Sequence, residues 1–534
     1  MQQTVERLGR PAAPGIAAGP LVFLGQAIAR RQSTGDAACE RRDLDLAIHG
    51  AIATIRALAA KFKGEAAAIL EFQVAMLEDE ALVAPAHERI AAGVDAATAW
   101  SDTVAGQIAD YESGTDEYFR ARAADLRDLR EEVHRHLSGE AGFNLPAGAV
   151  LAGEDVTPSR FLSVDWTLGG GIALFAGSPS SHVAMLARSR GVPMIVGIGK
   201  LDLAGHDTAI IDGDAGRIVL SPQSSDWSAF EVAKSMVARR DAEEATATME
   251  PAVTRDGVAI KVMINVAEPE ELDRLDPAIC DGIGLVRTEF LFGRGSGLPD
   301  EETQYRAYRR FAEWAAPKPV VLRTLDAGGD KPVAGLTIEG ESNPFLGTRG
   351  IRLSLARPEI FRVQLRAMAR AATHGNVRVM LPMVTIPEEI DRAAALLDAA
   401  VAELESESVP CVRPPLGIMV EVPAVAITPA LFAKAAFFSI GSNDLTQYVT
   451  AAARDIAAVS SLNDPGHPAV ISLIGQVVMA GAKLHIDVSL CGDMGGDPEH
   501  LPMLIAAGLR SVSVAPPLVG RAKRAIAAID AGRP

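Results

Sequence analysis

Cysteine is scarce in this chain, and the cysteines that occur are far apart. Among 534 residues there are four, with no CxxC pair: Cys39, Cys280, Cys411 and Cys491. A disulfide framework or a structural zinc site needs several closely spaced cysteines, so neither is indicated. This usage fits a reducing compartment, and we expect a cytoplasmic protein.

The sequence also lacks a hydrophobic run long enough to cross a membrane. Its N-terminus shows no charged-then-apolar signal pattern. The longest uncharged stretch, about residues 166 to 187, is broken by Gly169, Gly170, Gly171, Gly177 and Pro179. Since a membrane helix needs about 20 consecutive apolar residues, we predict no membrane span.

Positive charge is in deficit, and this excludes a class of partners. The chain has 51 Lys and Arg against 68 Asp and Glu, which gives a net charge of −17. Such a chain repels polyanions, so no nucleic acid partner is expected, although a small anion can still bind a local arginine cluster. Its length exceeds the roughly 100 to 200 residues of a typical domain, so several domains are expected. With 48% apolar residues, large cores can be buried.

Helical periodicity dominates the stretch from about residue 30 to 140. The apolar residues that recur at helical spacing are Ile48, Ile52, Ile55, Ala59 and Phe62, and later Leu126, Leu129, Val133 and Leu137. Strand-like alternation is almost absent there. We therefore predict a helical bundle, which serves either as a stability domain or as a docking surface.

Near residue 145 the pattern changes to short apolar runs separated by Gly, Pro and Asp. These runs, AVLAG, IALFAG, PMIVGIG, TAIIDG and RIVLSP, are typical of strands. Between the second and third lies a helix-like segment that contains His182, preceded by serines that can cap its start. A small α/β domain is predicted from about 145 to 222. Residues 225 to 249 are polar and helix-forming, and we predict that they form a rigid connector.

From Val258 onward strand candidates alternate with helical stretches. The expected strands end near Val266, Arg287, Asp326, Met383, Glu421, Gly441, Cys491 and Val514. Eight strands with intervening helices over about 280 residues match a (β/α)₈ TIM barrel. The fold class is thus α/β multidomain, with the barrel at the C-terminal end.

Reactive side chains collect where the expected barrel strands end, which is the face that carries active sites in this fold. These are Arg287, Arg323, Asp326, Glu421, Asn443, Asp444 and Cys491, with Arg454 just beyond the sixth strand. Planar guanidinium groups suit phosphate oxygens. Two carboxylates on neighbouring strands, Glu421 and Asp444, offer hard oxygen ligands for Mg²⁺. The pattern favours a site for a phosphorylated acid.

Several motifs closely resemble enzyme I of the phosphoenolpyruvate-dependent phosphotransferase system. They are LVRTEFLF at 285–292, RTLDAGGDK at 323–331, NPFLGTRGIR at 343–352, GIMVEVPA at 417–424, FFSIGSNDLTQY at 437–448 and CGDMGGD at 491–497. The resemblance implies that phosphoenolpyruvate is bound by Arg287, Arg323, Asn443, Asp444 and Arg454. It also implies that Glu421 and Asp444 bind Mg²⁺ and that Cys491 is the proton donor. A thiol at the barrel mouth suits this last role, because enolpyruvate must be protonated at carbon.

The surroundings of His182 carry the second half of the resemblance. GSPSSHVAMLARSRGVPMIVG at 177–197 is similar to the phosphohistidine site of enzyme I, and Thr157 upstream is a candidate to orient the ring. An imidazole can accept a phosphoryl group, and a nearby helix start stabilises its charge. The family usually has Gly-Gly before this site and Thr or Ser after the histidine, whereas this chain has Ser178 and Val183.

The N-terminal third distinguishes enzyme I from its relatives. Pyruvate phosphate dikinase and phosphoenolpyruvate synthase place a long nucleotide-binding domain before the histidine, but here only about 180 residues precede it. No Walker-type glycine loop is present, in agreement with a phosphate source other than ATP. The resemblance implies a phosphohistidine α/β domain (1–29 and 145–224), a helical domain that binds the carrier HPr (30–144), a linker helix (225–250) and a phosphoenolpyruvate-binding barrel (251–534). It also implies a homodimer through the barrel, although the chain continues only about twenty residues beyond the last strand.

The leading hypothesis is a two-step relay. His182 takes phosphate from phosphoenolpyruvate, pyruvate is released, and a histidine of HPr accepts the phosphate in the first step of sugar uptake or its regulation. A nucleotide-dependent dikinase relative and a non-catalytic phosphoenolpyruvate sensor stay as alternatives. Which HPr-type carrier and which sugar the protein serves are properties of other proteins.

Overall fold

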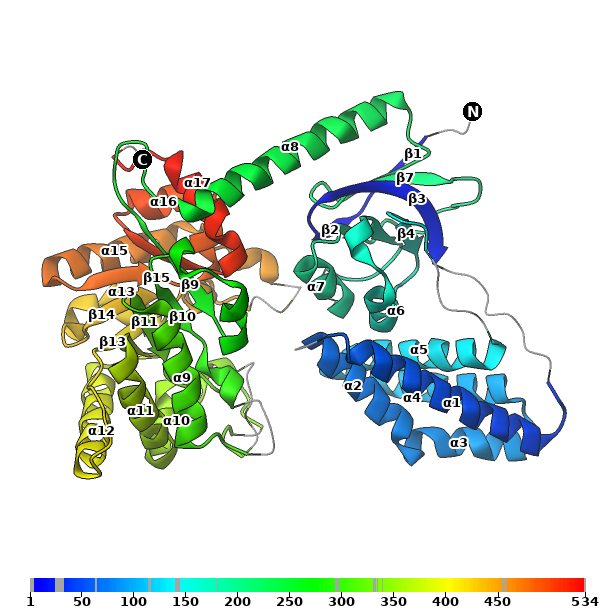
Figure 1. Ribbon diagram of the computed structural model, residues 1–534, viewed down its shortest axis with the longest axis horizontal. Helices are drawn as coiled ribbons and strands as arrows, with labels where there is room; N and C mark the ends of the chain where they lie inside the picture. The colour runs from blue at the N-terminus through cyan, green and yellow to red at the C-terminus, as the bar shows by residue number, and fades with distance from the viewer. Residues whose placement is uncertain are drawn as a thin grey trace. The chain divides into compact units, whose positions relative to one another are not determined.

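The computed structural model describes residues 4–24, 33–62, 65–113, 117–139, 145–179, 181–292, 297–329, 333, 335–338, 340–453, 456 and 459–532. The chain divides into two compact units, Met1–Val237 and Ala238–Pro534. The first contains a sheet and a helical bundle, and the second contains a strand barrel surrounded by helices (Figure 1). The expected multidomain α/β architecture is confirmed.

One sheet organises the α/β part of the first unit. Among the described residues it holds eight strands in the order β1-β8-β7-β3-β4-β5-β6-β2. Their bounds are Val5–Leu8 (β1), Arg10–Ala13 (β2), Ile16–Leu24 (β3), Val150–Gly153 (β4), Gly171–Leu174 (β5), Met194–Val196 (β6), Thr208–Asp212 (β7) and Arg217–Leu220 (β8). The strands expected between residues 145 and 222 are all present. Because β3 pairs with both β4 and β7, the N-terminal strands belong to the same sheet.

A helical bundle is inserted between β3 and β4, as predicted. Its helices within the described residues are α1 (Ala37–Ala59), α2 (Glu65–Glu78), α3 (Glu80–Ala91), α4 (Ala96–Ser113) and α5 (Glu117–Ser138), and α6 (Pro158–Ser163) and α7 (His182–Ser189) follow in the α/β part. The facing sides of the bundle helices bury Leu44, Trp100 and Leu129 completely. The same apolar cluster includes Phe161 of α6 and Leu186 of α7. The bundle therefore packs against these two helices of the α/β part.

A closed parallel barrel forms the core of the second unit. Within the described residues its strands are β9 (Lys261–Val266), β10 (Ile283–Val286), β11 (Pro319–Arg323), β12 (Asn376–Leu381), β13 (Leu416–Val420), β14 (Phe437–Ile440), β15 (Asp487–Leu490) and β16 (Ser511–Val514). Sequence neighbours pair in parallel, and β16 pairs with β9 to close the barrel. Each strand ends within three residues of its expected end, so the barrel prediction is confirmed. Continuous apolar runs such as Ile283–Val286 suit strands that are buried on both faces.

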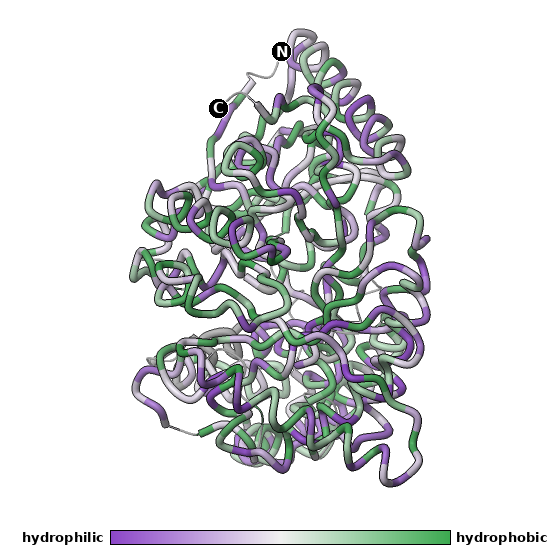
Figure 2. The backbone as a smooth tube through the Cα atoms, turned by 90° about the vertical axis from the view of Figure 1, so that its left-hand side faces the viewer, coloured by the Kyte–Doolittle hydropathy of each residue, from purple (hydrophilic) through white to green (hydrophobic). Residues whose placement is uncertain are grey.

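Helices cover the outside of the barrel and supply its outer core. They are α9 (Glu301–Ala315), α10 (Ile351–Ala356), α11 (Pro358–Ala371), α12 (Pro387–Ser406), α13 (Pro423–Ile427), α14 (Ser442–Thr450), α15 (Pro468–Leu484), α16 (Leu501–Ala506) and α17 (Val519–Ala527). On α9 the buried face carries Ala307, Tyr308 and Phe311, while the opposite face is charged. Hydrophilic and hydrophobic stretches alternate at short range along the described part of the chain (Figure 2). Accordingly, none of the helices in the described part of the chain is long and apolar enough to span a membrane.

The predicted connector is a single helix, α8 (Ser224–Met249). In its first half, Phe230 packs with Ile210 and Val219 of the N-terminal sheet. In its last turns, the backbone carbonyl of Thr248 accepts a hydrogen bond from Lys523 Nζ on α17 at 2.8 Å. Gly520 lets α17 approach α8 closely, since a Cβ at that position would lie 2.2 Å from the carbonyl oxygen of Glu244. The last turns of α8 are therefore anchored to the barrel.

Candidate active site at the mouth of the barrel

The residues singled out from the sequence lie at or directly after the carboxyl ends of the barrel strands. Arg323 is the last residue of β11, and Arg287, Glu421 and Cys491 come directly after β10, β13 and β15. Asn443 and Asp444 lie in the first turn of α14, which follows β14. In a parallel barrel these ends meet at one face, so the side chains share one site. Arg454 lies outside the described residues.

Arg349, which sequence reasoning missed, connects two of the acids in this site. Its guanidinium donates to both carboxylate oxygens of Asp326 at 3.0 Å and to those of Asp444 at 3.1 and 3.2 Å. Only 1% of the residue is exposed. Arg349 belongs to the motif at 343–352, but it precedes α10 and does not end a strand. A search limited to residues at strand ends therefore does not identify it. The motif itself was the signal that could have identified it.

Arg323 is buried among acids in the same way. It forms ion pairs with Glu289, which sequence reasoning also missed, and with Asp326 at 3.1 Å. Burial lowers the pKa of the Arg323 guanidinium, but the attraction of Glu289 and Asp326 outweighs this and raises the pKa above its ordinary value. The buried Nε atom of Arg323 has no hydrogen-bond partner among the residues that the structure describes. A permanently charged donor is therefore available at the end of β11.

Glu421 is a buried acid whose negative charge is destabilised by its surroundings. It is 1% exposed, and its Oε1 atom accepts a hydrogen bond from the backbone N–H of Met383 at 2.6 Å. Burial, followed by the nearby charges of Asp444 and Asp326, raises the pKa of Glu421 to about 8. A divalent cation between Glu421 and Asp444 would remove this repulsion.

The carboxylates at the barrel mouth fit a Mg²⁺ ion that takes part of its ligands from the substrate. Within the described ranges there is no group of three or more His, Cys, Asp or Glu side chains that could hold a metal. Magnesium is commonly bound by one or two carboxylates, with the remaining ligands coming from substrate phosphate and water. Glu421 and Asp444 supply this minimal set. Asp326 pairs with both Arg323 and Arg349, and Asp444 pairs with Arg349.

Cys491 is a buried thiol at the top of the barrel interior. It is 4% exposed and packs in a cluster whose other members are Leu285, Val321, Met380, Met419 and Phe437. Its Sγ lies 3.7 Å from the carbonyl oxygen of Ile440. Burial raises the pKa of Cys491 to about 11, and the nearby Ser439 hydroxyl lowers it only in part. The sulfur therefore carries its proton at neutral pH, as a proton donor must.

Asn443 and Arg287 lie at the edge of the site. Asn443 is held by Asp493 through two hydrogen bonds of 3.0 Å, one from its own Nδ2 and one to its Oδ1. Arg287 is exposed and lines a pocket with Asn265, Glu271 and Asp493 at the ends of β9, β10, β15 and β16. Arg287 thus places a guanidinium group on the wall of this pocket, whereas Arg323 and Arg349 are buried.

His182 is the first residue of α7, in the other unit, and its side chain lies outside what the structure describes. The expected serine cap is present, since Ser181 Oγ accepts a hydrogen bond from the N–H of Ala184 at 3.2 Å. Val183 is buried in the core shared with the bundle. The Oγ1 atom of Thr157 is buried and has no hydrogen-bond partner in the described part of the chain, so its expected role beside the ring stays a prediction.

Comparison with known proteins matches the chain along most of its length. Three models of phosphoenolpyruvate-utilising enzymes match it: the N-terminal model at residues 8–122, the mobile domain at 145–216 and the PEP-binding domain at 241–531. The phosphoenolpyruvate-protein phosphotransferase of Geobacillus stearothermophilus is 36% identical over 523 residues, which cover 94% of this chain and 90% of that protein.

Two further relatives agree with this assignment. The phosphoenolpyruvate-protein phosphotransferase of Listeria innocua is 36% identical over 90% of this chain and 85% of its own length. The multiphosphoryl transfer protein of Rhodobacter capsulatus is 37% identical over 86% of this chain and 55% of its own length. Identity of this level over nearly the full chain, together with the barrel-mouth geometry, shows that the chain belongs to the phosphoenolpyruvate-protein phosphotransferase family of phosphoenolpyruvate-utilising enzymes.

Proposed function

We propose that this protein transfers the phosphoryl group of phosphoenolpyruvate to His182 and then to a histidine of the carrier HPr, as enzyme I of a phosphotransferase system. The observation that carries the proposal is the cluster of the buried residues Arg323, Arg349 and Glu421 with the partly buried Asp444, in a chain of this family. Arginines and acids buried together at a barrel mouth form a preorganised site for a phosphorylated acid.

The substrate is held by guanidinium groups. Arg287, Arg323 and Arg349 are the described donors for its phosphate and carboxylate, with Asn443 and Asp444 beside them, and Arg454 is proposed as a further donor. Glu421 and Asp444 are proposed to bind Mg²⁺, which when present supplies positive charge to the phosphate oxygens. Arg349 also holds Asp326 and Asp444 by their oxygens, so it orders the acids as well as the substrate.

In the reaction, the bond between the phosphorus and the enol oxygen of phosphoenolpyruvate breaks as a ring nitrogen of His182 bonds to the phosphorus. The electron pair left on the oxygen gives the enolate of pyruvate, and Cys491 donates its proton to the methylene carbon to give pyruvate. The pKa of about 11 keeps that proton on sulfur until the carbanion character develops. The thiolate then regains a proton from water.

The start of α7 suits a phosphorylated histidine. Ser181 caps the helix, and the first backbone N–H groups of α7 can face an anion. The core accommodates the departure at Val183, because this side chain is 5% exposed and belongs to the same apolar cluster as Leu186. The neighbouring helical bundle is proposed as the docking surface for HPr. The phosphoryl group on HPr is then used for sugar uptake or its regulation, and the protein is proposed to act in the cytoplasm.

A homodimer through the barrel is also proposed. Ile427, Leu431 and Met479 are more than half exposed, and they lie on α13, the short helix η7 (Pro429–Phe432) and α15, which contact one another. Large apolar side chains gathered on one outer surface favour a protein partner.

The proposal is tested by incubating the protein with Mg²⁺ and phosphoenolpyruvate labelled in the phosphate. We expect acid-labile label on the wild-type chain, its transfer to added HPr, and no label on His182→Ala. Label that persists on the His182→Ala variant overturns the acceptor assignment, and label from ATP instead indicates a dikinase-like reaction. A protein that binds phosphoenolpyruvate without turnover in the presence of HPr is a sensor.

A further inference from the structure

A connected set of buried polar side chains lies beneath two loops of the barrel mouth. Its members are Gln304 and Tyr308 of α9, Gln364 of α11, and Thr288 of the short helix η4 (Thr288–Leu291), which follows β10. None is more than 1% exposed. Burying polar groups is costly unless each finds a partner, so such a set needs a reason to exist.

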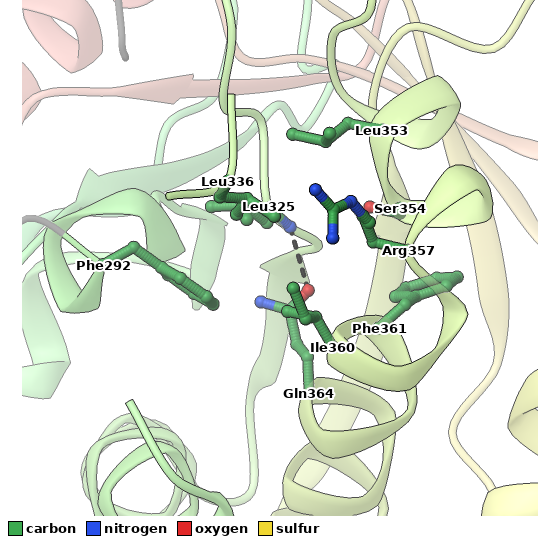
Figure 3. A pocket seen from close by; sticks show the side chains of 9 residues that line it. All are labelled: Phe292, Leu325, Leu336, Leu353, Ser354, Arg357, Ile360, Phe361 and Gln364. Atoms are coloured by element: carbon green, nitrogen blue, oxygen red, sulfur yellow. Dashed lines mark hydrogen bonds between the residues drawn. The ribbon is translucent and has the colours of Figure 1, made fainter. Parts of the chain in front are cut away.

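Gln364 is the centre of this set. Its Oε1 atom accepts a hydrogen bond from the backbone N–H of Leu325 at 3.0 Å, drawn as a dashed line in Figure 3. Its Nε2 atom donates to Thr288 Oγ1 at 3.3 Å and to the Tyr308 hydroxyl at 3.1 Å. Tyr308 in turn donates to Gln304 Oε1 at 3.1 Å. The side-chain amide of Gln364 therefore uses both its oxygen and its nitrogen.

The bonds reach the backbone where a strand of the barrel ends. β11 ends at Arg323, so the N–H of Leu325 lies beyond the strand, and Gln364 supplies its acceptor. On the other side, Thr288 Oγ1 donates to the carbonyl oxygen of Arg323 at 2.8 Å. Two buried side chains, Gln364 and Thr288, therefore hold the backbone segment that carries Arg323 and its ion-pair partner Asp326.

The same bonds tie this segment to the loop after β10. Thr288 lies between Arg287, which lines the pocket at the mouth, and Glu289, which pairs with Arg323. Gln364 and Thr288 therefore couple the two loops that carry these three charged residues.

The surroundings make the bonds hard to replace. Gln364 borders a small pocket whose walls are mainly apolar, with side chains of Phe292, Leu336, Leu353 and Phe361 among those in Figure 3. In such a low-dielectric setting, a polar network that is fully satisfied is rigid, and one that loses a member leaves unpaired groups.

We infer that Gln364 is a positioning residue for the reaction with phosphoenolpyruvate: through Leu325 and Thr288 it fixes the geometry of Arg287 and Arg323. The inference rests on the proposed function of the same site. It assigns no contact with substrate to Gln364, whose side chain lies in the core outside the barrel strands with Tyr308.

The test is single-turnover phosphorylation of the full-length protein by labelled phosphoenolpyruvate and Mg²⁺. Gln364→Leu has similar size but can neither accept from Leu325 nor donate to Thr288. We expect its rate constant to fall about 10- to 100-fold, the range seen when groups that orient site residues are lost. The final amount of label per chain should stay unchanged. Gln364→Glu keeps the acceptor for Leu325 and is expected to fall between wild type and Gln364→Leu.

A matched control separates this effect from general destabilisation. Thr254→Val also removes a buried hydroxyl of the second unit, which accepts from the N–H of Val258 at 2.9 Å, but it lies before β9, at the opposite end of the strands from the site. Loss of folded protein lowers the amount of label, not the rate constant of the molecules that react. Gln364→Leu with a wild-type rate constant, or with only a reduced final amount of label, overturns the inference. Absence of label on the wild-type chain instead refutes the proposed function.

Discussion

Replacing Arg349 with methionine tests whether the acids of the barrel mouth depend on this one guanidinium. Arg349 is 1% exposed, Asp326 is fully buried, and four contacts of 3.0 to 3.2 Å join Arg349 to Asp326 and Asp444. Removing one partner of a buried charge pair costs about 3–5 kcal/mol. Because Asp326 keeps Arg323 as a second partner at 3.1 Å, we expect the lower end of this range, about 3 kcal/mol. At about 1.36 kcal/mol per factor of ten, the folding equilibrium of the barrel then shifts by roughly 160-fold.

A second substitution isolates the pair. Asp326→Asn removes one of the two carboxylate charges that Arg349 compensates, so the cost of Arg349→Met should be smaller by at least about 1 kcal/mol in the Asp326→Asn background than in the wild type. Arg349 also lowers the pKa of Glu421, so its loss should raise that pKa further above about 8 and weaken Mg²⁺ binding at neutral pH.

The measurement is urea unfolding with hydrogen exchange read by mass spectrometry on barrel peptides, which separates the second unit from the first. Arg362→Met is the matched control: Arg362 lies on α11, is half exposed and contacts both oxygens of Glu403 at 3.0 Å, yet a surface pair contributes little. If Arg349→Met is no more destabilising than this control, the buried-charge reasoning is wrong.

Three further outcomes are expected. Iodoacetamide should modify Cys491 far more slowly at pH 8 than the partly exposed Cys39, because burial raises the pKa of Cys491 to about 11; equal rates by peptide mass spectrometry would contradict this. Burial lowers the pKa of His134, whose Nε2 lies 2.5 Å from Ser101 Oγ, so on acidification this imidazole is protonated in the unfolded chain before it is protonated in the folded bundle. The stability of the bundle should therefore hold above pH 6.5 and fall below it. Thermal unfolding of His134→Gln should lose this pH dependence. Gly520→Ala should destabilise the packing of α17 against the last turns of α8 by about 1–3 kcal/mol, which should speed amide hydrogen exchange at residues 238–249. Unchanged hydrogen exchange there would contradict the close-packing argument.

Much of the architecture was readable from local pattern. Helical periodicity located the bundle, and eight apolar runs located the barrel strands to within three residues, because burial on both faces of a parallel sheet forces continuous apolar sequence. The position of reactive residues after those runs placed Arg287, Glu421 and Cys491 at one face, since parallel strands end together. Ser181 and the helix it caps followed from capping chemistry alone.

The tertiary structure decided which residues contact each other when no local sequence pattern connects them. The pairing of Arg349 with Asp326 and Asp444, which lie 23 and 95 positions away, brings the segment between β11 and α10 together with the start of α14. The raised pKa of Glu421 and the bonds of Gln364 to Leu325 and Thr288 likewise require burial away from water. Sequence determined which chemical groups this protein has and on which elements they lie. Only folding decided which of them are neighbours, because charge and hydrogen bonding act over a few ångströms of space rather than along the chain.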